Sequence, residues 1–353
     1  MSTQSSLKRW LRRTVLTLLT SLCLLQTASA LDNYATIFVF HRFGDKRYPS
    51  TSVSLDDFRR ELSYLKENGY QVISLEQLYK TISSGKEIPK KSVVITIDDG
   101  YRTTYKAFKI LKEFKFPFTV FLYMETIDRY PDFLTLKQIR EMEESGLVDF
   151  ENHLYSHPSL AKLRAELPRE SYLKVLKREA ELSEKRFKEI FGRKPKFLAF
   201  PYGEYDKISV SFFKERGYKL LLTQDRGSYS GKGILVPRFA VVGNQSGFKN
   251  FVRNLQIEPL VVEEHKPDIG LIKTDLVEIA FKVEKPEEYK SCWIYLTGNG
   301  WVRGIREKSW IRSPFKLKLK KLRSRAGIRC INREMGKRAE FFYLIIGKGA
   351  KAP

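Results

Sequence analysis

The sequence predicts an α/β protein: a distorted (β/α) barrel of about seven strands, followed by a small antiparallel β-sandwich. Short apolar runs alternate with amphipathic helical segments between residues 36 and 223, the pattern of parallel βαβ units. Several of these runs lead directly into His, Asp or Pro-Tyr clusters. After about residue 257 the pattern changes to the two-residue period of strands with one buried face.

The predicted strands of the barrel are short and apolar. The clearest is Val93–Ile97, in which all five residues are β-branched, as suits a strand buried on both faces. About seven strands in βα order favour a barrel over an open sheet. The other expected strands span residues 36–40, 70–74, 118–122, 148–150, 197–200 and 220–223.

Helices are expected between these strands. Ser54 is a good N-cap for a helix that ends at Gly69. The longest helix begins after Pro168 and ends at Gly192. The remaining helices are expected at residues 75–82, 103–114, 136–144 and 208–215.

The first 30 residues read as a signal peptide. A basic segment is followed by the apolar run Val15–Leu25 and by the small-residue cleavage site Ala28-Ser29-Ala30. We therefore expect an exported, periplasmic or extracellular protein that starts at Leu31. An uncleaved segment that keeps the protein associated with the membrane is the alternative.

The mature chain divides into three parts. We expect the barrel over residues 31–257, a linker at 258–269 and a basic β-sandwich-like domain at 270–353. In that last domain, residues 277–283 alternate between apolar and polar, and Asn299-Gly300 is typical of a β-hairpin. Its Cys292 and Cys330 could form one disulfide in an oxidising compartment, or could be two small buried apolar residues.

Positive charge is concentrated at the C-terminal end. The chain carries a net charge of +23, and residues 301–353 alone contribute +13. Such a segment favours an anionic polymer or a membrane surface as a partner, whereas a solvated basic face is the simpler alternative. No nucleic-acid partner is expected.

The candidate site residues follow predicted strands. Asp98 and Asp99 come directly after the 93–97 strand, and His153 and His157 follow the strand at 148–150. An Asp-Asp-Gly turn taken alone suits a helix cap equally well. The carboxyl ends of barrel strands meet at one face, where active sites form, so these side chains are expected to lie together.

Two imidazoles and the carboxylate of Asp99 would make a three-ligand metal site with open positions. Pro158 argues against a helix at His157, so a loop pair is expected. A zinc ion is the expected cofactor, with cobalt, nickel or iron as the other candidates, because the same ligand types also serve non-haem iron.

The neighbouring residues suit hydrolysis of an amide or ester. Asp98 is a natural general base for a metal-bound water, and His41, after the first strand, is a candidate proton donor. A backbone N–H near Tyr202 could stabilise an oxyanion. The alternative for His41 is a hydrogen-bonded core histidine.

These motifs resemble the polysaccharide deacetylases of carbohydrate esterase family 4, the NodB-homology domain, from His41 to Val242. Thr96-Ile97-Asp98-Asp99-Gly100 is similar to the first motif of that family, which implies the base and a metal ligand. His153-Leu154-Tyr155-Ser156-His157 is similar to the second, which supplies two more ligands.

The third motif departs from the family pattern. Most members carry Arg where this chain has Ala199, and that Arg tunes the base; Arg238 is a candidate substitute. The early His41 is similar to the acid of exported poly-N-acetylglucosamine deacetylases. Pro201, Tyr101 and Arg238 are candidates for substrate binding.

The resemblance implies a metal-dependent hydrolase of non-peptide carbon–nitrogen bonds. Its expected substrate is an acetylated glycan: a surface polysaccharide, peptidoglycan or a glycolipid sugar, from which it removes N-acetyl groups. The rival interpretation is a catalytically silent glycan-binding protein of the same fold, supported by the missing third-motif Arg.

Overall fold

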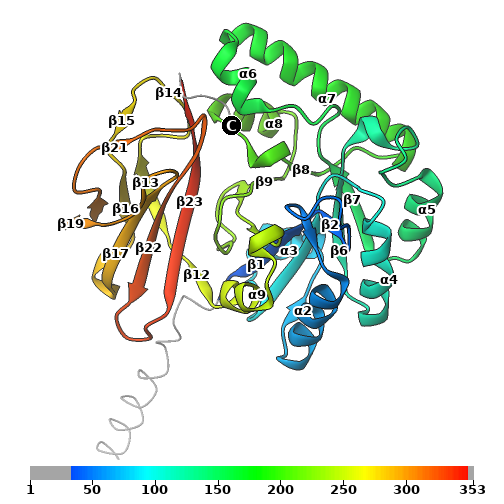
Figure 1. Cartoon of the computed structure of the whole chain (residues 1–353), viewed down its shortest axis with the longest axis horizontal. Helices are drawn as coiled ribbons and strands as arrows, with labels where there is room; N and C mark the ends of the chain where they lie inside the picture. The colour runs from blue at the N-terminus through cyan, green and yellow to red at the C-terminus, as the bar shows by residue number, and fades with distance from the viewer. Residues whose placement is uncertain (1–32, 349–353) are drawn as a thin grey trace, which may run out of the picture. The chain divides into compact units, whose positions relative to one another are not determined.

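A parallel β-sheet forms the frame of the N-terminal part of the protein (Figure 1). In the computed structural model, which describes residues 33–348, its strands pair in the order β10-β9-β8-β7-β6-β5-β1-β11, with β4 beside β5. The strands are β1 (Ala35–Phe40), β4 (Gln71–Val72), β5 (Ser92–Ile97), β6 (Phe118–Leu122), β7 (Val148–Asn152), β8 (Phe197–Ala199), β9 (Leu220–Leu222), β10 (Leu235–Val236) and β11 (Phe239–Ala240).

The two ends of this sheet approach each other. Strands β10 and β11 lie at opposite ends of the pairing order, yet only Pro237 and Arg238 separate them in sequence. The backbones of Ala35 and Tyr229 also bridge the gap, with hydrogen bonds of 2.9 Å in both directions. The sheet is therefore curved into a barrel-like form, which confirms the predicted fold class.

Helices cover the outside of this sheet, and local signals explain where they begin. The Ser54 side chain accepts a hydrogen bond from the backbone of Asp57, and the long α7 ends at a left-handed Gly192. The helices are α2 (Leu55–Glu67), α3 (Leu75–Ser83), α4 (Thr104–Phe114), α5 (Leu136–Glu144), α6 (Leu160–Glu166), α7 (Arg169–Phe191), α8 (Lys207–Glu215) and α9 (Phe248–Leu255).

Alternation along the strands fills the barrel and aims the site residues. Ile37 and Val94 belong to a cluster that also contains Phe121, Ala199 and Leu222, from the facing strands β6, β8 and β9. Side chains two residues apart share a face of a strand. Two further steps of two residues from Ile37 and Val94 reach His41 and Asp98, which directly follow β1 and β5. The side chains of His41 and Asp98 therefore lie above the packed interior.

The C-terminal strands form antiparallel and mixed sheets, drawn from yellow to red in Figure 1. The largest has the order β12-β23-β22-β17-β18, with β14 beside β23; a second has the order β13-β16-β20-β19. The strands are β12 (Ile257–Pro259), β13 (Val262–Lys266), β14 (Gly270–Ile272), β15 (Leu276–Val277), β16 (Ala280–Val283), β17 (Tyr289–Leu296), β18 (Gly300–Arg303), β19 (Ile305–Glu307), β20 (Trp310–Arg312), β21 (Leu317–Lys318), β22 (Arg323–Asn332) and β23 (Arg338–Gly347).

A second apolar core lies within these C-terminal sheets. It brings together buried side chains of β16, β17 and β22, among them Phe281, Ile294 and Ile328. Cys292 and Cys330 face each other across the β17–β22 pair and form a disulfide. The sequence had left their pairing open, because local patterns do not set the register between distant strands.

Two boundaries differ from the sequence-based expectation. The segment 258–269, expected as a linker, contains the end of β12 and the whole of β13. The alternating run 277–283 is divided between β15 and β16. The first difference arises because pairing with other strands, β23 for β12 and β16 for β13, orders residues with no strong local pattern. The second arises because β15 pairs with β21, whereas β16 pairs with β13 and β20.

The expected signal peptide, residues 1–30, lies outside the described residues. Among residues 33–348, no helix combines the length and the apolar character needed to cross a bilayer.

Candidate active site

The site begins at the carboxyl end of β5. Asp98 and Asp99 follow Ile97, and the backbone then enters the left-handed region, with φ of +71° at Asp99 and +75° at Gly100. A Cβ atom at Gly100 would lie 2.6 Å from Cδ2 of Leu122 on the neighbouring β6. A glycine is therefore required here, and the turn sends the two carboxylates in different directions.

Asp99, His153 and His157 converge into one cluster. The Oδ1 atom of Asp99 lies 3.2 Å from Nε2 of His153 and 3.1 Å from Nε2 of His157. The potential ligand atoms of the three residues all lie within 4.8 Å of one another. His153 and Asp99 are buried, whereas His157 is partly exposed, so the cluster is open to solvent on one side.

The donor chemistry of this cluster suits a bound cation. Nδ1 of His153 lies 2.8 Å from the carbonyl of Ala199, which can only accept, so that nitrogen carries the hydrogen. In the neutral imidazole, its Nε2 is then a bare lone pair directed at the carboxylate oxygen of Asp99. That oxygen is buried without a hydrogen-bond partner among the described residues. Facing acceptors of this kind are the arrangement that a divalent metal stabilises.

The loop that carries the histidines is held by an acid from helix α7. Glu179 accepts hydrogen bonds from the backbone N–H of Tyr155 at 3.1 Å and of Ser156 at 2.9 Å. Its other oxygen accepts from the Ser156 hydroxyl. No helix contains His153 or His157, as expected from Pro158.

Left-handed backbone is concentrated around the cluster. Leu154, His157 and Tyr202 have φ of +65°, +53° and +57°, in addition to Asp99. Non-glycine residues in this region cost energy and persist where the surrounding structure holds them, often at functional sites.

Asp98 lies beneath the cluster in contact with Arg238. The guanidinium Nη1 and Nη2 each donate to one oxygen of Asp98 at 2.7 Å, and both side chains are fully buried. Arg238 also donates to the Thr223 carbonyl at 2.8 Å and the Thr96 hydroxyl at 3.1 Å. Burial opposes ionisation of Asp98, but the charge of Arg238, together with its hydrogen bonds and smaller contributions from His153 and His41, outweighs it and lowers the pKa of the carboxyl.

His41 follows β1 beside these groups. It is partly exposed, and its Nδ1 is buried without a hydrogen-bond partner in the described part of the chain. Burial lowers the pKa of its imidazole, opposed by the charges of Asp99 and Asp98. A hydrogen bond at Nδ1, as expected for a core histidine, is therefore absent among the described residues.

Aromatic rings surround the exposed edge of the cluster. The ring centroid of Tyr202 lies 4.5 Å from that of His157, and Tyr202 is 44% exposed. Tyr123 lies 5.4 Å from His157 on another side. Tyr101 lies under the guanidinium of Arg42, 3.5 Å from the ring centroid. This edge offers flat apolar surfaces, which suit a sugar ring.

Of the predicted residues, the structure brings His41, Asp98, Asp99, His153 and His157 to one end of the barrel, with Tyr202 at the exposed edge. Pro201 is buried, and Arg238 lies against Asp98. Sequence reasoning missed Glu179, although an acid on the core-facing side of α7, next to Ala180, was a usable signal.

Comparison with known proteins gives a consistent result. Residues 85–221 match the protein family described as Polysaccharide deacetylase. Two curated relatives are named poly-beta-1,6-N-acetyl-D-glucosamine N-deacetylase. That of Escherichia coli K12 is 28% identical over 63% of this chain and 37% of its own length. That of Staphylococcus aureus MRSA252 is 28% identical over 63% of this chain and 78% of its own length.

A solved structure has the same fold. The Streptococcus pyogenes deacetylase PplD, in complex with acetate, aligns with a TM-score of 0.55 at 23% identity, over 63% of this chain and 98% of its own. The alignments leave about a third of this chain unmatched, and the chain spans well under half of the Escherichia coli relative.

Proposed function

We propose that this chain is a metal-dependent hydrolase that removes N-acetyl groups from a surface glycan of N-acetylglucosamine. The proposal starts from the match of residues 85–221 to the polysaccharide deacetylase family. The observation that carries this proposal is the convergence of Asp99, His153 and His157 beside an Asp98 that Arg238 holds ionised. The relatives' names support the sugar.

Asp99, His153 and His157 would hold the metal. When bound, a divalent ion supplies a water of lowered pKa and polarises the acetyl carbonyl. The hydrogen bond from His153 to the Ala199 carbonyl fixes the ring orientation, and Glu179 fixes the loop. Zinc is our proposal for the ion, because two imidazoles and one carboxylate form a frequent catalytic zinc set.

Asp98 is the proposed base. Ionised and buried, it can take a proton from the attacking water, and its two bonds to Arg238 fix the direction of its oxygens. Arg238 occupies the role that the Arg missing at position 199 has in the related deacetylases. It is a positioning residue here; direct substrate contact is proposed for Tyr101 instead, and Pro201, which is buried, is not assigned a contact.

His41 is the proposed proton donor to the leaving amine. It lies near Asp98 and Asp99, is partly exposed, and leaves Nδ1 unpartnered in the described structure. The backbone N–H of Tyr202, in a left-handed turn directly after β8, is the proposed oxyanion donor.

The test is acetate release from N-acetylglucosamine oligomers and from peptidoglycan, with metal content measured on the same preparation. Asp98→Asn and His153→Ala should abolish release, whereas the control Asp56→Asn, at an exposed site on α2, should not. We expect one metal per chain, lost in His153→Ala. Bound metal without acetate release from any glycan would instead support the silent glycan-binding protein.

We also propose that the protein is exported, with residues 31–257 as the catalytic domain and the basic sheets after residue 270 as a domain that faces an anionic polymer or membrane. The Cys292–Cys330 disulfide supports an oxidising compartment. Deleting the segment from residue 270 and measuring both acetate release and retention at the cell surface would separate the two roles.

A further inference from the structure

An arginine-rich groove lies between the barrel and the largest C-terminal sheet. Its volume is about 520 Å³, within the usual range for ligand sites. From the barrel side it is lined by Gln224, Arg226, Arg238, Phe239, Ala240, Gln245 and Arg253, and from the sheet side by Tyr295, Thr297, Trp301, Arg325, Arg329, Arg338 and Phe342.

The sheet side of the groove is one face of four paired strands, β18, β17, β22 and β23. Tyr295 lies opposite Trp301 in the β17–β18 pair, and opposite Gly327 in the β17–β22 pair. The Phe342 ring lies over Gly327, where a Cβ atom would meet it at 2.3 Å. Glycine at this position therefore lets three aromatic rings gather: Trp301 lies 5.1 Å from Tyr295 and 5.9 Å from Phe342.

The groove has an excess of positive charge. Arg238 is neutralised by Asp98, but five other arginines line the groove, and among residues 33–348 two carboxylates contact them. Glu340 contacts three of the arginines: Arg226 at 2.7 Å, Arg329 at 2.6 Å and Arg338 at 3.9 Å. Asp225 contacts a fourth, Arg325, at 2.7 Å.

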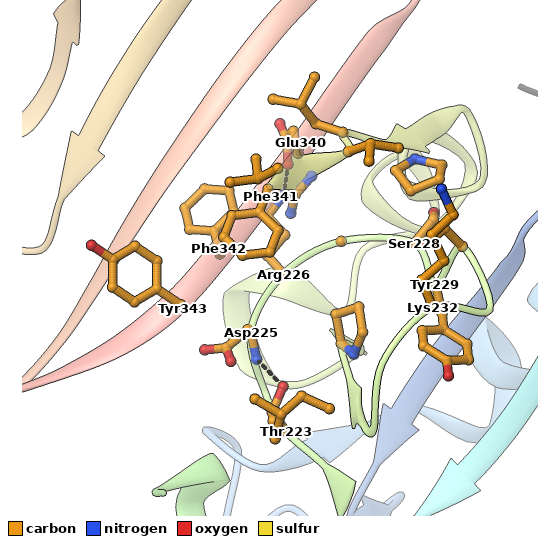
Figure 2. A pocket seen from close by; sticks show the side chains of 18 of the residues that line it. Thr223, Asp225, Arg226, Ser228, Tyr229, Lys232, Glu340, Phe341, Phe342 and Tyr343 are labelled. Carbon is orange, nitrogen blue, oxygen red and sulfur yellow. Dashed lines mark hydrogen bonds and ion pairs between the residues drawn. The ribbon is translucent and has the colours of Figure 1, made fainter. Parts of the chain in front are cut away.

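Figure 2 shows the Arg226–Glu340 pair in a neighbouring cavity that shares Arg226 and Phe342 with the groove. Arg253, on α9, is exposed, and in the described part of the chain its guanidinium donates a hydrogen bond to the Asn250 side chain rather than to an acid. Burial lowers the pKa of Arg338, and the charges of Arg329, Arg226 and Arg253 lower it further, against the opposing charge of Glu340. Mutual repulsion of this kind is relieved by an anion.

Trp301 gives the groove a surface for a sugar. It is 36% exposed, although large apolar side chains are normally buried, and the Arg329 guanidinium lies 4.0 Å from its ring centroid. An aromatic face beside guanidinium groups suits a ring with C–H bonds on one side and a carboxylate or phosphate on its edge.

The groove adjoins the candidate active site. Arg238 lines the groove and contacts Asp98 in the barrel interior. Arg325 lines it too, and its Nη2 donates to the Gly203 carbonyl at 2.9 Å, in the turn that carries Tyr202. Arg238 and Arg325 therefore link the lining of the groove to the base and to the turn of the candidate active site.

We propose that this groove is a subsite for an acidic glycan, binding a sugar that carries a carboxylate or phosphate in the same chain as the acetylated sugar. The inference rests on the proposed deacetylase function and adds the substrate class. The C-terminal sheet is then part of the substrate-binding surface, rather than only a surface anchor.

The test compares the affinity of the full chain for neutral and acidic oligomers by calorimetry. The probes are N-acetylglucosamine hexamers, the same hexamers phosphorylated at O6, and hyaluronan hexamers, in which N-acetylglucosamine alternates with glucuronate. We expect at least one acidic probe to bind about tenfold or more tightly than the neutral hexamer at low salt, with the advantage reduced at high salt. Comparing the two acidic probes identifies the anion.

Two variants should weaken this binding. Arg253→Gln removes a charge without leaving a buried carboxylate unpaired, and should lower affinity for the acidic probe about tenfold. Trp301→Ala should lower affinity for charged and neutral hexamers alike. The controls Arg306→Gln and Phe315→Ala, both exposed in the same domain but away from the groove, should leave affinity unchanged.

Three results would overturn the proposal. One is equal affinity for the neutral and both acidic hexamers. Another is an equal loss for Arg253→Gln and Arg306→Gln, which would mean diffuse attraction. The third is an affinity for polyphosphate equal to that for the acidic hexamers and unchanged by Trp301→Ala. That result would mean that the groove is a general polyanion surface. None of these depends on acetate release, so failure of the deacetylase activity is detected separately.

Discussion

Arg238 and Asp98, 140 residues apart in the sequence, form a fully buried pair with two parallel hydrogen bonds of 2.7 Å. The pair joins the segment between β10 and β11 to the carboxyl end of β5. It ties that segment to the barrel interior and holds the proposed base at the same time, which makes it the first target for mutation.

Arg238→Lys should lower kcat for acetate release about 10- to 100-fold, because lysine keeps the charge but cannot make the two parallel bonds. Metal content should stay near that of the parent protein, since Arg238 contacts none of the three proposed ligands.

Arg238→Gln should in addition lower the free energy of unfolding by about 3 kcal/mol or more, because it leaves the Asp98 charge buried and unpaired. Steady-state kinetics, metal analysis and urea unfolding separate these effects. Unchanged kcat in Arg238→Lys would remove the positioning role.

Glu179→Gln should weaken metal binding about tenfold without abolishing it. The amide keeps one oxygen but loses the charge that accepts three hydrogen bonds from Tyr155 and Ser156, so the loop of His157 becomes less well held. Competition with a chelator measures the affinity. Glu181→Gln, an exposed change on the same helix, is the control. Equal affinities for both variants would show that the loop holds its shape without Glu179.

Glu61→Gln should raise stability at alkaline pH. Both oxygens of Glu61 are buried without partners in the described structure, and burial, then Asp57, raise its pKa to about 9. A carboxyl with a raised folded pKa contributes stability that is complete below its unfolded pKa and declines as pH rises toward the folded value. Between about pH 5 and 9 the parent should therefore lose stability that Glu61→Gln retains, about 2 kcal/mol or more at pH 8.

The measurement is the free energy of unfolding in urea across that pH range. Glu67→Gln, exposed on the same α2, is the matched control and should follow the parent. Parallel pH curves for the parent and Glu61→Gln would contradict the prediction.

Replacing Cys292 and Cys330 with Ser should lower the free energy of unfolding by about 2–4 kcal/mol, as expected for a cross-link spanning 38 residues. The disulfide lies in the core of the C-terminal sheet, so the loss of stability should affect the C-terminal sheets rather than the barrel. Thermal unfolding with and without reductant checks it. Reductant should destabilise the parent and leave the double variant unchanged, and acetate release from neutral oligomers should persist in both.

Much of the candidate active site could be predicted from sequence because its signals are local. A β-branched run such as Val93–Ile97 specifies a buried strand, and polar residues directly after such strands lie together because parallel strands end at one face. The same reasoning placed His153 and His157 in a loop. The six expected helices agree closely with the structure, since caps such as Ser54 and stops such as Gly192 act within one turn, whereas α6 and α9 were not expected.

The tertiary structure alone decided which distant segments meet. The contact of Arg238 with Asp98 depends on barrel curvature, and the Cys292–Cys330 pairing on the register of β17 with β22. The arginines of the groove are scattered over α9, β22, β23 and the loops near β10, so their common surface is invisible along the chain. Periodicity is a property of neighbouring residues, whereas an ion pair, a disulfide or a groove depends on the packing of whole elements.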